Sequence, residues 1–189
     1  MKKFLLSALA ALALAGFLAA DTFKVDGSHS NVGFKVKHMM VSNVVGSFGS
    51  FSGTIDYNEK AQKLTGISGT VEAASIDTGD EKRDKHLRAP DFFDTEKYPA
   101  ITFVMKKMKG DKVIGDLTMR GVTKEVALEL EMGGVADDPW GNRRIGFTLE
   151  GKIDRREFGL EYNKVLEAGG LAVGHDVKLV VELEGMRKK

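Results

Sequence analysis

The chain of 189 residues has no cysteine, only 3 prolines and a single tryptophan. The lack of cysteine excludes a disulfide framework, a thiolate zinc site, a cysteine nucleophile and the lipidated cysteine of a bacterial lipoprotein. An excess of charge of one sign is missing too, because 28 basic residues stand against 27 acidic ones. Proteins that bind nucleic acid usually carry a strongly basic surface. We therefore expect no nucleic-acid partner.

Long hydrophobic runs are also absent, apart from one at the N-terminus. Two lysines follow the initial methionine, an apolar run covers residues 4–18, and two alanines precede the polar Asp21. A run of about 15 residues is too short to span a bilayer and is typical of a signal peptide. We expect residues 1–20 to be a cleaved signal peptide that directs residues 21–189 to the periplasm through the Sec pathway. A retained anchor is the alternative, and we expect no stable membrane anchor.

The mature chain shows the period of β-strands almost everywhere. Apolar and polar residues alternate, as they do where successive side chains of a strand point to opposite faces of a half-buried sheet. Turn-forming glycine, asparagine and aspartate separate these segments. The pattern predicts an all-β domain of about eight closely spaced antiparallel strands, in a sandwich or a barrel. The segments are 32–36, 51–57, 67–73, 101–105, 113–119, 126–132, 145–153 and 177–183.

Residues 80–94 depart from the strand pattern. A run of mixed charge from Asp80 to Arg88 predicts a short exposed helix, and Pro90 predicts its end. Asp91 then suits the start of a second helical turn that presents the rings of Phe92 and Phe93. These rings either plug one end of the core or form a mobile lid over a ligand entrance, since loops at barrel mouths often carry binding residues.

The inward faces of the predicted strands raise the question of whether the interior is filled. An eight-stranded barrel is just wide enough to be packed with side chains or to hold one small ligand. Gly53, Gly69, Gly115 and Gly151 share their faces with large apolar residues. These glycines either leave room for a ligand or mark bulges and bends. The candidate lining of an apolar tunnel comprises Phe34, Val36, Phe51, Phe92, Phe93, Ile101, Phe103, Met105, Leu117, Met119, Leu130, Phe147 and Leu149.

Motifs that carry catalysis are missing. The sequence has no G-x-S-x-G nucleophile elbow, no G-x-x-x-x-G-K-[ST] or G-x-G-x-x-G phosphate loop, and no H-E-x-x-H metal motif. His29 lies near Asp26, but a metal site there would need further ligands that the sequence does not indicate. We therefore expect neither an enzyme, nor a cofactor, nor a metal site.

Polar residues near the ends of the apolar rows are candidates to bind a ligand head group. His38 continues the inward alternation of Phe34 and Val36, and would place one polar group at the end of an apolar row. A histidine satisfied elsewhere or facing solvent is the alternative. Arg120, together with Lys124, Arg155 and Arg156, has the charge to bind a phosphate, although exposed turns explain these residues equally well.

A series of short motifs resembles a known family. The segment from Asp26 to Phe51, DGSHSNVGFKVKHMMVSNVVGSFGSF, is similar to the opening of the YceI-like family of exported lipid- and polyisoprenoid-binding proteins. Arg120 departs from the family pattern, which commonly has histidine at this turn. The other matching motifs follow in the family's order and cover the mature chain: SIDT at 75–78, DKHL at 84–87, DFFD at 91–94, YPAITF at 98–103, GDLT at 115–118 and GVTK at 121–124.

The resemblance implies a lipocalin-like antiparallel barrel whose elongated apolar tunnel holds an isoprenoid, a quinone-like molecule or a fatty amphiphile, with His38 and Arg120 as candidate head-group ligands. The expected function is that of a periplasmic carrier or sequestering protein for such a lipid. Two alternatives stay open: an enzyme that modifies the lipid, with His38 or an aspartate near Asp91 as acid or base, and a stress-related structural barrel with a filled core. An exposed edge strand makes a homodimer possible.

Overall fold

The computed structural model describes residues 20–164 and 171–188. The predicted signal peptide, residues 1–20, lies outside the described residues except for Ala20. Within the described ranges, none of the helices combines the length and the apolar character that crossing a bilayer requires.

The described residues form one antiparallel sheet of eleven strands, so the prediction of an all-β fold is confirmed. Helical structure is short: α1 spans Glu81–Arg88, and the 3₁₀ turns η1 and η2 span Ala73–Ser75 and Arg155–Phe158. The strands are β1 (Asp21–Val25), β2 (Asn31–His38), β3 (Ser42–Phe48), β4 (Phe51–Asn58), β5 (Lys63–Glu72), β6 (Ile76–Asp77), β7 (Ala100–Lys109), β8 (Lys112–Met119), β9 (Val122–Asp137), β10 (Asn142–Asp154) and β11 (Val173–Lys188).

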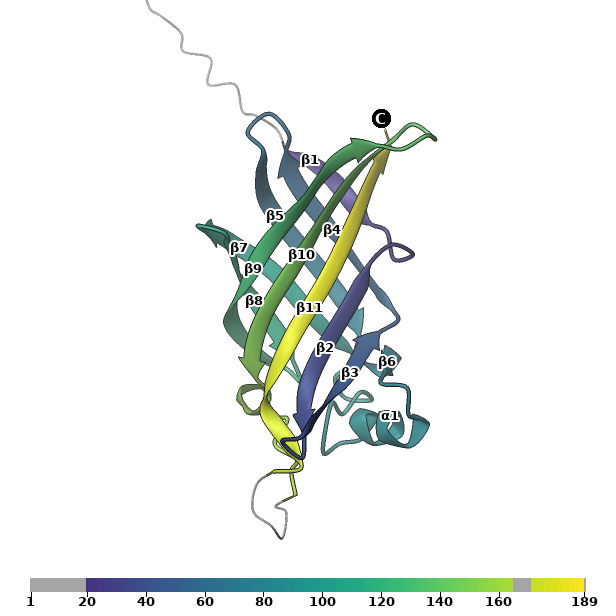
Figure 1. Ribbon diagram of the computed structural model, residues 1–189, viewed down its shortest axis with the longest axis vertical. Coiled ribbons are helices and arrows are strands. Elements are labelled where there is room, and N and C mark those ends of the chain that lie inside the picture. The colour runs from purple at the N-terminus through teal and green to yellow at the C-terminus, as the bar shows by residue number, and fades with distance from the viewer. Residues whose placement is uncertain (1–19, 165–170, 189) are drawn as a thin grey trace, which may run out of the picture.

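Eight of these strands close into a barrel. The order β1-β4-β5-β7-β8-β9-β10-β11 returns to its start, because Gly185 and Met186 of β11 pair with Val25 and Lys24 of β1. Earlier along β11, residues 177–182 pair instead with β2, and β3 and β6 continue this branch. Figure 1 shows that β1 belongs to the upper part of the barrel, whereas β2 and β3 extend toward the lower end, where α1 lies.

The prediction of about eight barrel strands is confirmed, but their identity differs in one place. The segment predicted at 32–36 is a strand, β2, yet it lies on the branch outside the closed ring. Its place in the ring is taken by β1, which the alternation had not indicated. β1 is only five residues long, and ring closure is a long-range pairing that local periodicity does not encode. β3 and β6 were not predicted either.

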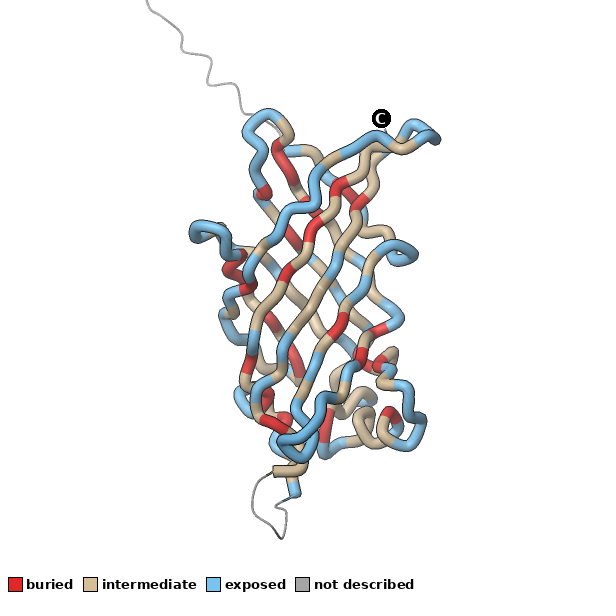
Figure 2. The backbone as a smooth tube through the Cα atoms, in the orientation of Figure 1, coloured by how far each residue is buried: buried red, intermediate tan, exposed pale blue. Residues whose placement is uncertain are grey.

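The upper half of the barrel is filled by side chains. Phe23, Ile55 and Ile145 come from three different strands and are at most 1% exposed. Gly185 makes room for them, because a Cβ at this position would lie 2.8 Å from Ile55 Cδ1 and 3.0 Å from Phe23 Cβ. We call this group the upper cluster; it consists of Phe23, Ile55, Tyr57, Leu64, Ile67, Val113, Leu128, Ile145, Phe147 and Leu149. Figure 2 shows the alternation of buried and more exposed residues along these strands.

The segment that follows β6 crosses the lower end of the barrel. The carboxylate of Asp80 caps α1 by accepting hydrogen bonds from the backbone N–H groups of Lys82 and Arg83, both at 3.0 Å, so the predicted helix at 80–88 is confirmed. The predicted second helical turn at Asp91 is wrong. This aspartate binds Nε2 of His86 at 2.7 Å, and the chain reverses in turns after Pro90 instead of continuing a helix.

Candidate functional site

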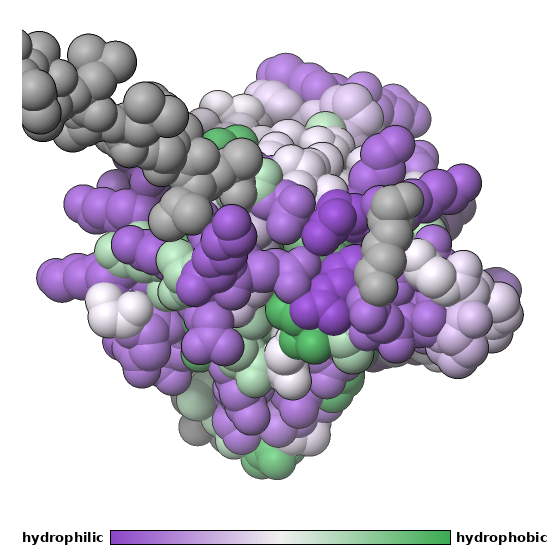
Figure 3. All heavy atoms as spheres, turned by 90° about the horizontal axis from the view of Figure 1, so that it is seen from above, coloured by the Kyte–Doolittle hydropathy of each residue, from purple (hydrophilic) through white to green (hydrophobic). Residues whose placement is uncertain are grey.

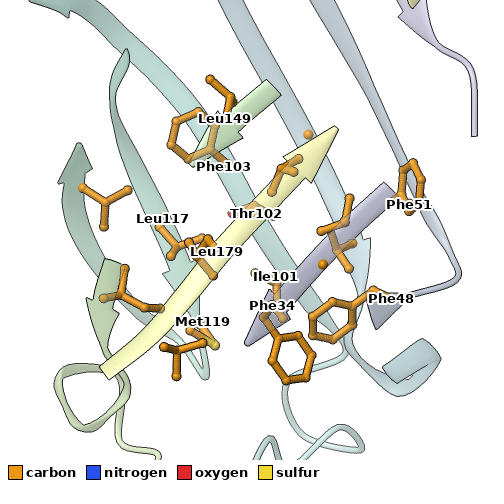
Figure 4. Close-up of a pocket in the computed structure, with 18 of the residues that line it drawn as sticks. Phe34, Phe48, Phe51, Ile101, Thr102, Phe103, Leu117, Met119, Leu149 and Leu179 are labelled. Atoms are coloured by element: carbon orange, nitrogen blue, oxygen red, sulfur yellow. The ribbon is translucent and has the colours of Figure 1, made fainter. Parts of the chain in front are cut away.

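Below the upper cluster, the interior of the barrel is hollow. The cavity has a volume of about 210 Å³, and its wall is almost entirely apolar. Figure 4 shows side chains around the cavity, among them Leu117 and Met119 of β8 and the neighbouring Leu179 and Phe34 of the paired strands β11 and β2. The inward side chains of β11 that line the cavity are only partly buried, since the space in front of them is empty; they are Val177, Leu179, Val181 and Leu183.

Ten of the thirteen residues predicted to line a tunnel are on the wall of this cavity: Phe34, Val36, Phe51, Phe92, Phe93, Ile101, Phe103, Leu117, Met119 and Leu149. The other three predicted residues are not on the cavity wall. Met105, Leu130 and Phe147 have the expected inward orientation, but they pack in or against the upper cluster. Alternation identifies the face of a strand on which a side chain lies, whereas its height along the barrel decides whether it meets core or cavity.

The predicted head-group residues do not line the cavity. His38 lies at the exposed end of β2, two residues beyond the wall residue Val36. Arg120 is held by the loop below the barrel, where its Nη1 donates hydrogen bonds to the carbonyl oxygens of Pro90, at 2.9 Å, and Phe92. Neither side chain is therefore on the cavity wall, and their role as head-group ligands stays a prediction. Arg120 braces the turn that carries Phe92.

The two phenylalanines of that turn close the lower end of the cavity. Phe92 is 7% exposed and packs edge-on against His86, with ring centres 4.9 Å apart. Its ring also packs against Tyr162 in a tilted arrangement at 4.8 Å. Phe93 packs edge-on against Phe48 at 5.9 Å. Of the two interpretations of these rings, this geometry corresponds to a plug.

The inward glycines have two different roles. Gly53 and Gly69 face each other on β4 and β5 and line the cavity. A Cβ on Gly69 would meet only the carbonyl oxygen of Ser52, at 3.6 Å, so this glycine leaves room as one interpretation expected. A Cβ on Gly53 would lie 2.5 Å from the carbonyl oxygen of Ser68, so this glycine allows the two strands to approach closely. At Gly115 and Gly151, neighbours already fill the space: a Cβ would lie 2.4 Å from the ring of Phe103 in the first case and 2.4 Å from Leu128 Cδ2 in the second. These two glycines accommodate side chains of the barrel itself.

One residue of the cavity wall is charged, and in the sequence it is only one of four basic residues with the charge to bind a phosphate. Arg155 begins η2, is 4% exposed and lines the lower part of the cavity. Its Nε donates to the carbonyl oxygen of Gly174 at 2.9 Å, Nη1 to that of Leu160, and Nη2 to that of Val173 at 3.4 Å. Burial lowers the pKa of this guanidinium from its ordinary value. No signal in the sequence separates Arg155 from its exposed neighbour Arg156, which pairs with Asp154 at 2.5 Å.

A second polar cluster lies at the upper end. Asp26, His29 and Glu184 bring three possible metal-ligand atoms within 4.8 Å of one another. The guanidinium of Arg144 already sits among them, because its Nη1 donates to the carboxylates of both Asp26, at 2.9 Å, and Glu184. Hydrogen bonds from Ser28, His29 and Arg144 hold the pKa of Asp26 well below its usual range. A fixed cation thus takes the place that a metal ion would occupy.

A closed antiparallel barrel with an apolar cavity puts this chain in the class of small β-barrels whose interior has room for a ligand. The chain belongs to the YceI-like family, since the model of the YceI-like domain matches residues 23–185. Protein YceI of Escherichia coli is 38% identical over 197 aligned residues and is covered completely, as is this chain.

Two solved structures place the fold among known proteins. The YCEI protein of Campylobacter jejuni superposes with a TM-score of 0.67 at 37% identity, over 87% of this chain and 96% of that one. A domain of Saccharophagus degradans described as polyisoprenoid-binding gives a TM-score of 0.59, over 86% and 97% of the two chains. At 14% identity, the second likeness shows the fold alone. None of these relatives is named as an enzyme, in agreement with the prediction that the chain is not one.

Proposed function

We propose that this protein is a periplasmic carrier or sequestering protein for one long-chain amphiphilic lipid, an isoprenoid, a quinone-like molecule or a fatty chain, held in the barrel cavity. The observation that carries the proposal is the apolar cavity of the lower half, where wall side chains of β11 such as Leu179 remain partly exposed inside an otherwise closed barrel. An empty apolar cavity leaves hydrophobic surface unpaired, and a hydrocarbon chain is the ligand that such a wall favours. The name of the polyisoprenoid-binding neighbour supports the same class of ligand.

Export to the periplasm is part of the proposal. It is motivated by the two lysines and the apolar run at the start of the chain. A carrier on that side of the membrane would shield a water-insoluble chain while it crosses an aqueous compartment. Cell fractionation with intact-mass measurement tests this part separately: we expect periplasmic protein that lacks about the first 20 residues, and full-length chain in the cytoplasm would contradict it.

The expected affinity follows from the apolar area of the ligand. Each buried CH₂ contributes about 0.8 kcal/mol. Ordering of the chain and loss of its motional freedom offset part of this gain, and non-covalent affinities saturate near about 20 kcal/mol. Because the wall is smooth and apolar, we expect tight binding with little selectivity for chain detail. Selectivity then depends on chain length and on the few polar groups of the wall.

Organic extraction of the natively purified protein, followed by mass spectrometry, tests the proposal. The wild type should release about one lipid per chain. Met119→Asp places a carboxylate on the cavity wall, where burying it next to hydrocarbon costs several kcal/mol, so its bound lipid should fall at least tenfold. Met132→Asp is the matched control, because Met132 is 39% exposed and not part of the wall; it should keep the wild-type lipid content.

Thermal melting of the same variants separates loss of lipid from loss of fold. If Met119→Asp unfolds, Leu179→Asn introduces a smaller polar change on the partly exposed wall and takes its place. A wild type that yields no stoichiometric lipid, or a folded wall variant that retains the full amount, would contradict the proposal.

A further inference from the structure

Arginines at the upper end of the barrel are neutralised by carboxylates. Nη2 of Arg143 lies 2.6 Å from Glu59, Nε of Arg144 lies 2.8 Å from Asp138, and Nη2 of Arg187 lies 3.1 Å from Glu59. Seen from above, this end is covered mainly by hydrophilic residues (Figure 3). Each upper guanidinium thus has its counter-ion within the chain.

Several arginines near the lower end have no such partner among the described residues: Arg83 and Arg88 of α1 bind Thr78 and backbone carbonyl groups, and Arg120 and Arg155 lie beside the barrel end itself. Arg155 and Arg120 donate hydrogen bonds only to backbone carbonyl oxygens, and within residues 20–164 and 171–188 neither has a carboxylate within 4.0 Å. Both lie next to the turn after η2: Nη1 of Arg155 binds the carbonyl of Leu160, and Nε of Arg120 would lie 3.7 Å from a Cβ on Gly159. Of the two, only Arg155 lines the cavity.

Burial of a guanidinium that has no carboxylate at hydrogen-bond distance is unfavourable in free energy. Transfer of a charge from water into a protein interior is costly unless an opposite charge compensates it, and carbonyl dipoles compensate only in part. A guanidinium has five N–H donors, of which Arg155 uses three, one on each nitrogen. The two others, one on Nη1 and one on Nη2, have no hydrogen-bond partner among the described residues, and Arg155 lines the cavity. Phosphate and carboxylate oxygens match this donor geometry and form charge-assisted bonds with it.

We propose that the cavity selects amphiphiles with an anionic head group, a phosphate or a carboxylate, and that Arg155 binds this oxyanion while the apolar tail extends toward the upper cluster. This rests on the proposed function and adds the charge of the ligand to it. It also gives the buried cation a role that bracing the turn at Leu160 does not require, since a neutral donor would bind the same carbonyl groups.

Matched pairs of ligands test the proposal with delipidated protein at pH 8. Palmitate is compared with palmitamide, and farnesyl phosphate with farnesol, by calorimetric titration. Wild-type protein should bind the anionic member of at least one pair tenfold or more tightly than the neutral member, and the pair with the larger ratio identifies the preferred oxyanion. Arg155→Gln should reduce this ratio to about one while binding of the neutral member is retained, and Arg155→Lys should keep part of the preference.

Arg156→Gln is the control, because the neighbouring Arg156 is paired with Asp154 outside the cavity wall; it should keep the wild-type ratio. Equal binding of anionic and neutral ligands by the wild type would overturn the head-group inference and leave the carrier function intact. Binding of neither would instead refute the proposed function. If Arg155→Gln does not fold, the ratios of the wild type and of Arg155→Lys still decide the question, since a ratio near one in the wild type is sufficient to reject it.

Discussion

The upper and lower halves of the barrel share most of their strands and have opposite interiors. In the upper half, Phe23, Ile55 and Ile145 are almost completely buried against one another. In the lower half, the inward side chains of β11, such as Leu179, stay partly exposed to a cavity. The strand pattern is equally regular in both halves. Whether a barrel is filled therefore depends on which side chains meet at each height, not on how well the strands alternate.

The two ends of the barrel also differ in the groups that bind their arginines. Carboxylates pair with the arginines of the upper end, where the network ties strand ends together. The guanidinium of Arg155, at the lower end of the cavity, donates hydrogen bonds to carbonyl groups alone. The upper half has the features of a scaffold, and the lower half has those of a binding site.

The largest expected effect comes from truncating one phenylalanine in each half of the lipid-free protein. Phe23→Ala removes a ring from the filled interior and should lower the free energy of unfolding by about 3–5 kcal/mol. Phe51→Ala removes a cavity-lining ring, where a void already exists, and should cost only about 1 kcal/mol. Urea denaturation measures both. Equal losses would contradict the division into a filled and a hollow half.

Adding one methyl group to each half is the converse change. Gly185→Ala would force a Cβ to within 2.8–3.1 Å of Ile55, Phe23 and Ile145, and overpacking of this kind costs about 1–3 kcal/mol. Gly69→Ala meets only the carbonyl oxygen of Ser52 at 3.6 Å, an ordinary contact. This change should leave stability unchanged or raise it slightly, because alanine restricts the unfolded chain. Melting temperatures measure the difference, and a loss at Gly69 as large as that at Gly185 would show that the cavity is not open there.

A smaller effect concerns the pH dependence of the upper network. The hydrogen bond from Arg143 holds the pKa of Glu59 below its ordinary value of 4.5. A carboxylate whose pKa is lower in the folded state stabilises the protein above its unfolded-state pKa, and this contribution disappears as the pH falls through the folded-state value. The difference in stability between wild type and Glu59→Gln should thus be largest above about pH 4.5 and shrink in more acidic solution.

Glu129→Gln is the control for the pH series, since Glu129 makes only an exposed pair with Lys112 at 3.3 Å. It should change stability little at any pH between 2 and 7. Urea denaturation across this range measures both variants. A Glu59→Gln effect that stays constant down to pH 2 would contradict the proposed electrostatic origin.

Much of the fold was predictable because alternation is a local property. All eight predicted segments are strands, and the helix predicted at 80–88 is present as α1. β3 escaped prediction for a local reason: the ring of Phe34 covers Gly46, so the strand presents a glycine where an apolar side chain would mark the inward face. Closure through β1 and β11 was beyond reach, since it joins residues about 160 positions apart.

The site was predictable to the extent that it depends on which face of a strand is inward. Residues such as Phe34 and Met119 were found in this way. The height of a residue along the barrel, which separates Phe147 from Leu149, depends on strand stagger. The cavity role of Arg155 depends on burial by a turn that the sequence does not distinguish from a solvent-exposed one.

Hydrogen exchange with and without palmitate tests most directly whether the lower half alone receives the ligand. Occupation of the cavity should slow exchange in β2, in α1 and in the turn that carries Phe92 and Phe93, because these segments form its wall and its lower closure. Exchange in residues 21–24 and 55–64, which belong to the filled half, should not change. Slower exchange confined to the upper segments, or no change in the lower ones when palmitate is bound, would contradict the account.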